Sequence, residues 1–99
     1  MSLVTEAQIR GMVLVAEGEL DAAQAALWND IRIEPEVWSP ADGAEHGVGF
    51  WVLARHEGDL IWYDSLAEEF RAGTTFGEQV LPEPVAGARS LAELLAKVA

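Results

Sequence analysis

Residues 47–70 read GVGFWVLARHEGDLIWYDSLAEEF and carry the strongest structural signal in the chain. They hold two apolar runs joined by the turn residues Glu57-Gly58-Asp59, a pattern typical of a β-hairpin. Both faces of the first run are apolar, and a strand without a solvent face belongs in the middle of a sheet that is covered on both sides. One face is expected to carry Val48, Phe50, Val52 and Ala54, and the other Trp51 and Leu53. The stretch therefore predicts an antiparallel sheet whose core includes Phe50, Val52, Ile61 and Trp62.

Four short segments match the start of a helix, in which a small polar residue is followed three positions later by Glu or Gln. They begin at Thr5, Asp21, Ser65 and Ser90. We expect the first helix to end at Gly18, although the β-branched Val13 and Val15 leave a strand open there. Pro35 stops the second helix by Glu34. Asp64 to Phe70 is expected to form a short helical turn, and a final helix carries Leu91, Leu94, Leu95 and Val98.

The remaining segments complete the fold prediction. Residues 35–49 are rich in Pro and Gly and indicate a long loop, in which Trp38 is the tryptophan expected to be most exposed. Thr74–Leu81 is a plausible third strand, and Pro82 and Pro84 prevent further pairing. The order of elements predicts an α+β fold. It would be a single domain, residues 1–99, with a three- or four-stranded antiparallel sheet packed against two N-terminal helices and one short C-terminal helix.

Composition excludes several classes of function. The chain is 51% hydrophobic, which argues against intrinsic disorder. It has no Cys, so disulfides and thiolate chemistry are ruled out. Six basic and seventeen acidic residues give a net charge of −11, which disfavours nucleic acids and anionic membranes and favours a basic protein partner. Solubility alone is the simpler explanation of this charge and is the one that the charge by itself favours.

Neither a targeting segment nor a membrane-spanning run is visible, so the expected compartment is the cytoplasm. The sequence also has no phosphate loop, nucleophile elbow or zinc-protease motif. We therefore expect no enzymatic activity, no cofactor and no metal.

The densest acidic cluster consists of Asp64, Glu68 and Glu69, and together with Glu78 these are the residues expected to bind a partner. Asp64 and Glu68 have the spacing to hold a divalent cation on one helical face. The simpler explanation is that acids in a first helical turn satisfy free N–H groups. Asp64 is then the expected cap, with Ser65 as its competitor.

Aromatic residues and histidines offer a second candidate site. Trp38, His46, Trp51 and Tyr63 are the residues of a candidate pocket for a small molecule or glycan. Core packing is the better explanation for Trp28, Trp51 and Trp62, which lie in apolar runs. His46 and His56 are the only histidines and are candidate general bases, but neither has a nucleophile or an orienting partner nearby in the sequence.

Parts of the chain resemble a group of small uncharacterised bacterial proteins. The shared segments are Trp28 with Ile31-Arg32-Ile33 and Pro35, then Gly49-Phe50-Trp51-Val52, then Ile61-Trp62-Tyr63-Asp64 through Phe70, within about residues 20–76. In that group a Trp-Tyr-Asn-Asp-like box closes a hairpin. Here Asp64-Ser65 stands at the Asn-Asp position, and Glu69 replaces the Gly before Phe70. The resemblance implies no established activity. A more distant one is to SUKH-type toxin immunity proteins, which are also small, acidic and built on a sheet.

Protein–protein interaction is the function that these observations favour, with an immunity or inhibitor protein for a basic toxin as its specific form. The alternative is a small-molecule or glycan-binding domain. A homodimer is also expected, because the Thr74–Leu81 strand would leave a bare sheet edge.

Overall fold

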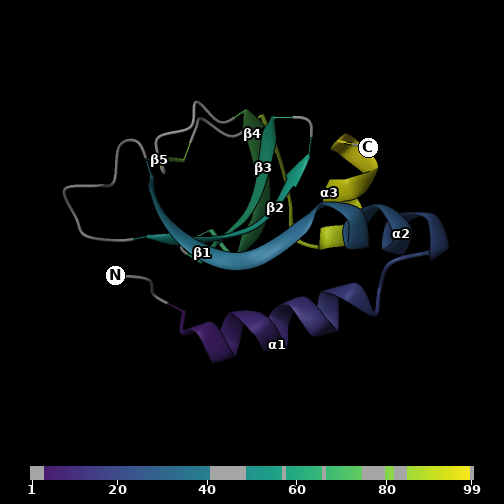
Figure 1. Cartoon of the computed structure of the whole chain (residues 1–99), viewed down its shortest axis with the longest axis horizontal. Coiled ribbons are helices and arrows are strands. Elements are labelled where there is room, and N and C mark those ends of the chain that lie inside the picture. Colours follow the sequence, from purple (N-terminus) through teal and green to yellow (C-terminus); the bar gives the residue numbers. More distant parts are fainter. Residues whose placement is uncertain are drawn as a thin grey trace.

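The computed structural model describes residues 4–40, 49–56, 58–65, 67–74, 80–81 and 85–98. Its elements are α1 (Glu6–Glu17), α2 (Ala22–Ile31), β1 (Arg32–Pro40), β2 (Phe50–His56), β3 (Asp59–Asp64), β4 (Glu69–Thr74), β5 (Val80–Leu81), β6 (Ala86–Ala88) and α3 (Leu91–Val98) (Figure 1). The fold is α+β, as predicted. No helix in the described ranges is long and apolar enough to cross a membrane.

The sheet has the strand order β5-β1-β2-β3-β4-β6. Five strands, β1 to β4 and β6, pair antiparallel, whereas the two residues of β5 pair parallel with the end of β1. The prediction of an antiparallel sheet is confirmed, and its size of three or four strands is wrong. The hairpin of β2 and β3 lies in the middle of the sheet, as the apolar character of both its faces required.

The first correction concerns residues 35–49, predicted as a loop. The first part of this segment belongs instead to the strand β1, Arg32–Pro40, and residues 41–48 lie outside the described ranges. Pro35 lies where the register between β1 and β2 shifts, between Arg32 and Glu36, and a proline is tolerated at such an irregularity because a regular ladder bond is not required there. Trp38 pairs with Phe50 on β2 and is only 2% exposed, so the prediction that it is the exposed tryptophan is wrong.

The second correction concerns Asp64 to Phe70, predicted as a helical turn. Asp64 Oδ1 does accept a hydrogen bond from the Ala67 N–H at 3.0 Å, so this carboxylate caps a turn. No helix follows, because Glu68 has φ 56° and reverses the chain into β4. The third strand is therefore Glu69–Thr74. Of the predicted strand 74–81, Thr74 ends β4, Val80–Leu81 form β5, and residues 75–79 lie outside the described ranges.

The helix starts at Thr5, Asp21 and Ser90 are confirmed. Thr5 and Gln8 form a reciprocal capping box, and so do Asp21 and Gln24. Ser90 Oγ accepts from the Glu93 N–H at 3.1 Å. Gly18 ends α1, as predicted.

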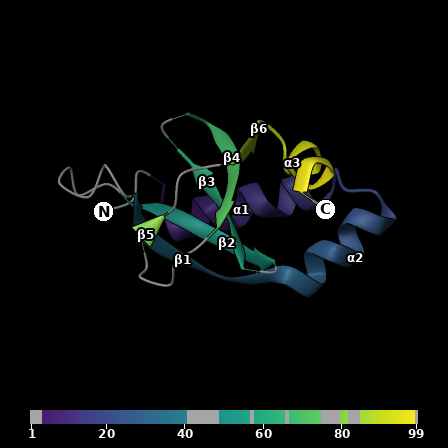
Figure 2. The same cartoon turned by 90° about the horizontal axis from the view of Figure 1, so that it is seen from above.

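All three helices cover one face of the sheet, here called the helical face. Figures 1 and 2 show α1 running along the sheet, with α2 and α3 together at one end. The buried helix residues on this face are Ile9, Ala16, Trp28, Ile31, Leu91, Leu94 and Leu95. The other face of the sheet, here called the opposite face, holds a second cluster of Trp38, Phe50, Val52, Leu60, Trp62 and Leu81. The four residues predicted for the core, Phe50, Val52, Ile61 and Trp62, are all buried.

A β-bulge in β2 changes which face Ala54 occupies. Val52 pairs with Trp62 and Ala54 pairs with Ile61, so the register shifts at Leu53. The extra residue puts Leu53 and Ala54 both on the helical face. The predicted alignment of Ala54 with Phe50 and Val52 is therefore wrong, because strict alternation ends at a bulge.

Candidate functional site

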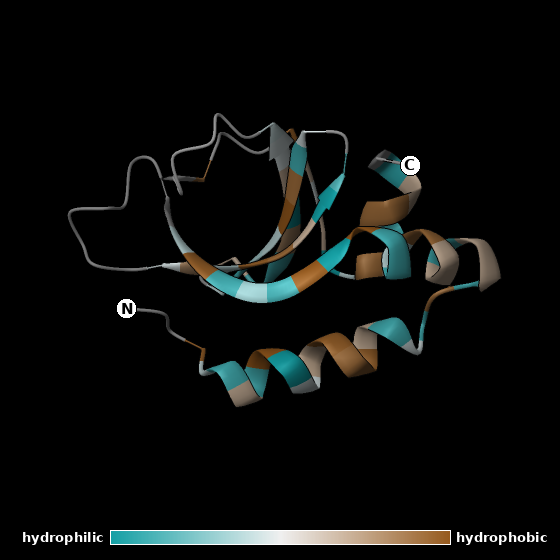
Figure 3. Ribbon diagram, in the orientation of Figure 1, coloured by the Kyte–Doolittle hydropathy of each residue, from teal (hydrophilic) through white to brown (hydrophobic). Residues whose placement is uncertain are grey.

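Two grooves flank α1 on the described surface. The α1–β1 groove, of about 540 Å³, lies between α1, α2 and β1. The α1–α3 groove, of about 720 Å³, lies between α1, the turn joining β3 to β4, and the start of α3. Figure 3 shows that the apolar residues of α1 gather in its C-terminal half, and Leu14 and Val15 there are 69% and 68% exposed.

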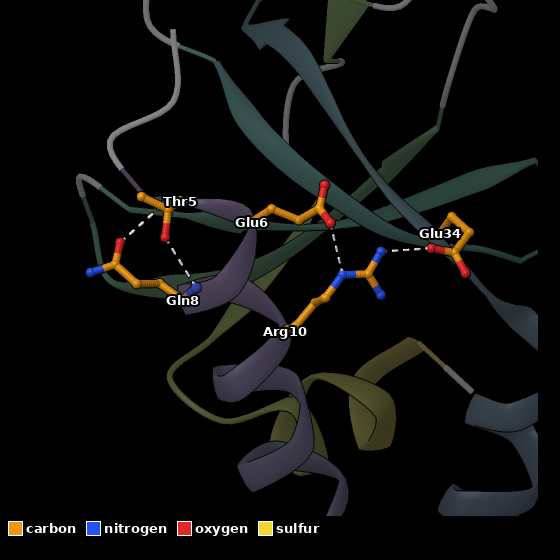
Figure 4. A network of polar contacts seen from close by, with 5 residues as sticks. All are labelled: Thr5, Glu6, Gln8, Arg10 and Glu34. Carbon is orange, nitrogen blue, oxygen red and sulfur yellow. Dashed lines mark hydrogen bonds and ion pairs between the residues drawn. The ribbon is translucent and has the colours of Figure 1, made fainter.

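The α1–β1 groove is crossed by ion pairs that fasten α1 to its neighbours. Arg10 contacts Glu6 at 3.1 Å and reaches Glu34 on β1 at 2.7 Å (Figure 4). Glu17 Oε2 accepts from the Trp28 indole N–H at 2.7 Å and pairs with Arg32 at 3.1 Å. Both arginines of this groove already hold carboxylates of the same chain, so its polar groups serve to anchor α1.

The Arg10–Glu34 contact leads to a prediction about the titration of Glu34. The hydrogen bond from Arg10 lowers the pKa of Glu34 below its ordinary value. Arg10→Gln should therefore raise the Glu34 midpoint toward the ordinary value in an NMR pH titration, whereas Arg55→Gln should leave it unchanged. Because the folded-state pKa is depressed, the contribution of Glu34 to stability is present above its unfolded-state pKa and is lost as the pH falls through the folded one. An unchanged Glu34 midpoint in Arg10→Gln would contradict the assignment.

The α1–α3 groove has an apolar floor and a charged rim. One wall is a single stripe of α1 and its ends, formed by Val4, Gln8, Gly11, Met12, Val15 and Glu19. The other wall consists of Tyr63, Glu68 and Phe70 from the β3–β4 corner and Arg89, Ser90 and Leu91 before α3. The charged groups on the rim are Glu19, Glu68 and Arg89. This combination suits an occupant with both apolar and charged side chains.

Tyr63 and Glu68 form the corner of this groove. The Tyr63 ring meets Phe70 edge-on, with centroids 5.2 Å apart. Burial raises the pKa of Tyr63, and the nearby Glu68 and Asp64 raise it further. The phenol therefore stays protonated at neutral pH and keeps its O–H as a hydrogen-bond donor.

The predicted partner-binding acids do not lie on one face. Asp64 on β3 pairs with Glu69 on β4, and two positions away Trp62 pairs with Arg71. Residues two positions apart in a strand point to the same face, so Asp64 and Glu69 lie with Trp62 on the opposite face of the sheet. Arg71 binds both of them, at 3.1 Å and 3.6 Å. Asp64 is 7% exposed. Glu68 reaches the α1–α3 groove, and Glu78 lies outside the described residues.

The predicted pocket residues are also divided between the two faces. Trp51 and Tyr63 pair across β2 and β3 and pack on the helical face. The Trp51 indole N–H donates to the Val4 carbonyl at 2.7 Å. Trp38 is buried on the opposite face with Arg55 5.4 Å over its ring. Because the sheet lies between Trp38 and the pair of Trp51 and Tyr63, these side chains do not share a pocket, and His46 lies outside the described residues.

Sequence reasoning missed the α1 side of the groove. Met12, Val13, Leu14 and Val15 form a continuous apolar run, and one face of a helix cannot bury four consecutive residues. An apolar run longer than one helix face can bury was therefore the sequence signal for an exposed apolar surface on α1. Within the described ranges, no cluster of three or more His, Asp or Glu residues is placed to hold a metal ion.

Comparison with known proteins yields no relative. No protein-family model, no curated protein and no solved structure matches this chain. The resemblances to small bacterial proteins and to SUKH-type immunity proteins therefore stay predictions, and function has to be argued from the surface itself.

Proposed function

We propose that this chain is an acidic protein-interaction domain that binds a basic protein. The observation that carries the proposal is how its cations are used. Arg10, Arg32 and Arg71 are each paired with carboxylates of the same chain, while Lys97 donates to the Gly87 carbonyl. Three of the six basic residues are thus neutralised by carboxylates of the same chain, and the large acidic excess is left for the surroundings.

The shape of the α1–α3 groove favours a macromolecular partner over a small ligand. Small-molecule sites are usually concave cavities with a few convergent polar groups. This groove instead follows α1 from Val4 to Glu19, and its polar groups are distributed along the rim. The described residues of the alternative aromatic pocket, Trp38, Trp51 and Tyr63, are divided between two faces of the sheet, which gives that function less support.

The specific form that we propose is an immunity or inhibitor protein for a basic toxin. Opposite charge speeds the encounter of two proteins and suppresses wrong partners. An inhibitor has to capture its target quickly, so a strongly acidic surface serves such a role. The charge and small size of the chain support this form.

The test measures how charge affects association. A basic protein retained from the source cell by the immobilised chain is purified, and its kinetics are recorded as salt is raised. We expect association to slow while dissociation changes less. Glu68→Lys should slow association further, and so should Asp30→Lys, an exposed position of α2 away from both grooves. Association that ignores salt and both variants would overturn the proposal.

A further inference from the structure

We propose that the α1–α3 groove binds an amphipathic helix of the partner, with apolar residues on its inner side and basic residues on its flanks. This inference rests on the proposed function and names the segment that the basic partner presents. The apolar side would lie against Met12, Val15 and Tyr63, and the basic flanks would reach Glu19 and Glu68.

The length of the groove fits a helix. Within α1 the stripe consists of Gln8, Gly11, Met12 and Val15, which share one face of the helix, while Val4 and Glu19 lie just beyond its two ends. The 12 residues of α1 span about 18 Å at about 1.5 Å per residue. A partner helix of about three turns covers nearly the same length, so the two helices can lie side by side along α1.

Gly11 allows close approach at the middle of the groove. A Cβ added there would meet nothing within 4 Å, so the space beside the α1 backbone is open. The separation of packed helices depends on the side chains between them. A glycine at this point lets a partner helix come near the α1 backbone, and no packing within the described part of this chain requires a glycine at that position.

The backbone of the walls favours a helix over an extended segment. β3 is paired on both sides, by β2 and β4, and β4 is paired by β3 and β6. Between its first and last turns, the N–H and C=O groups of α1 are used within the helix. An extended peptide would therefore find no strand edge to pair with in this groove, whereas a helix satisfies its own backbone groups.

The charges on the rim argue against a second copy as the occupant. Glu19 and Glu68 lie on opposite walls, while Arg89 lies near the start of α3. An occupying helix is therefore favoured when it carries Lys or Arg on the flanks near these two carboxylates. The helices of this chain are poor in such residues, with only Arg10 in α1, none in α2 and Lys97 in α3. Two copies would also bring together two net charges of −11.

The probe for this proposal is a synthetic Leu/Lys peptide whose leucines fall on one helical face. A scrambled peptide of the same composition carries the same charge without an apolar face. We expect the full chain to bind the amphipathic peptide more tightly in fluorescence anisotropy. Gly11→Gln should weaken that binding by about tenfold or more, which corresponds to about 1.4 kcal/mol, because the new side chain occupies the groove. Ala7→Gln, an exposed change on α1 outside both grooves, should leave the binding unchanged.

The fold of the variants is checked by thermal melting. Gln is a better helix former than Gly, so Gly11→Gln should not melt earlier than the original chain. Amide shifts in NMR on adding the peptide should map to the α1 stripe and to Tyr63, Glu68 and Ser90. These readouts separate a blocked groove from an unfolded helix.

Three results would overturn the groove proposal. If both peptides bind equally, with salt sensitivity and no effect of Gly11→Gln, the groove is not the site, while the proposed basic-partner function stands. If neither peptide binds, the groove proposal fails, and the proposed function is decided separately by the salt dependence of association with the basic protein. If light scattering shows a dimer that Gly11→Gln converts to a monomer, the occupant is a second copy.

Discussion

Trp62→Ala is expected to lower the free energy of unfolding by about 3–5 kcal/mol. Trp62 is 3% exposed and belongs to the buried cluster on the opposite face, with Trp38, Phe50 and Leu60 among its members. It lies in the middle strand β3, opposite Val52 on β2 and Arg71 on β4. Removing the indole loses its transfer free energy and leaves a cavity, since strands paired on both sides cannot move in to fill it.

The measurement is urea unfolding followed by circular dichroism. A small domain has about 5–15 kcal/mol in total, so the variant should be mostly unfolded at modest denaturant. Leu14→Ala is the matched control, because it removes a large apolar side chain that is mainly exposed, and it should cost far less. Equal transition midpoints for Trp62→Ala and the original chain would show that this cluster is not a packed core.

Arg71→Met is expected to cost about 2–3 kcal/mol of unfolding free energy. The guanidinium contacts Asp64 at 3.1 Å and Glu69 at 3.6 Å. Asp64 is buried, and its other oxygen caps the turn at Ala67. Removing Arg71 leaves a buried carboxylate without this cation, and removing one partner of a buried ion pair costs more than the pair contributes.

A second substitution identifies the cause of that loss. In the double variant Asp64→Asn with Arg71→Met, the carboxylate charge is gone and the amide oxygen still accepts from the Ala67 N–H. This variant should recover part of the loss in chemical denaturation. Arg32→Met serves as the control, since its ion pair with Glu17 is more exposed and should contribute less. A loss in Arg71→Met no larger than in Arg32→Met would contradict the assigned role of the Asp64 pair.

Local sequence patterns were sufficient for the elements that depend on neighbours in the chain. Thr5, Asp21 and Ser90 cap their helices through residues three positions away, and such bonds form wherever the helix forms. The hairpin of β2 and β3 needs one short turn and two apolar runs, all within residues 50–64. Its central place in the sheet followed from its two apolar faces.

Packing between distant segments determined the rest. β1 contains Pro35 and was predicted as a loop, yet it is a strand because β2 offers a partner that accommodates an irregular register. Its pairing with Phe50 also buries Trp38. Residues 64–69 carry helix-capping signals, but the pairing of β4 with both β3 and β6 overrides them.

The candidate site shows the same division. The acidic and aromatic residues are visible in the sequence, and they led to Glu68 and Tyr63 as predicted site residues. Both residues do line one groove. Because side chains alternate between the two faces along β3 and β4, Asp64 and Glu69 point away from that groove and pair with Arg71 instead. Gly11, Met12 and Val15 form one wall of the groove only because α1 packs against the helical face of the sheet. Hydrogen bonds between near neighbours can be predicted from the local sequence, whereas a groove depends on which distant surfaces are buried together.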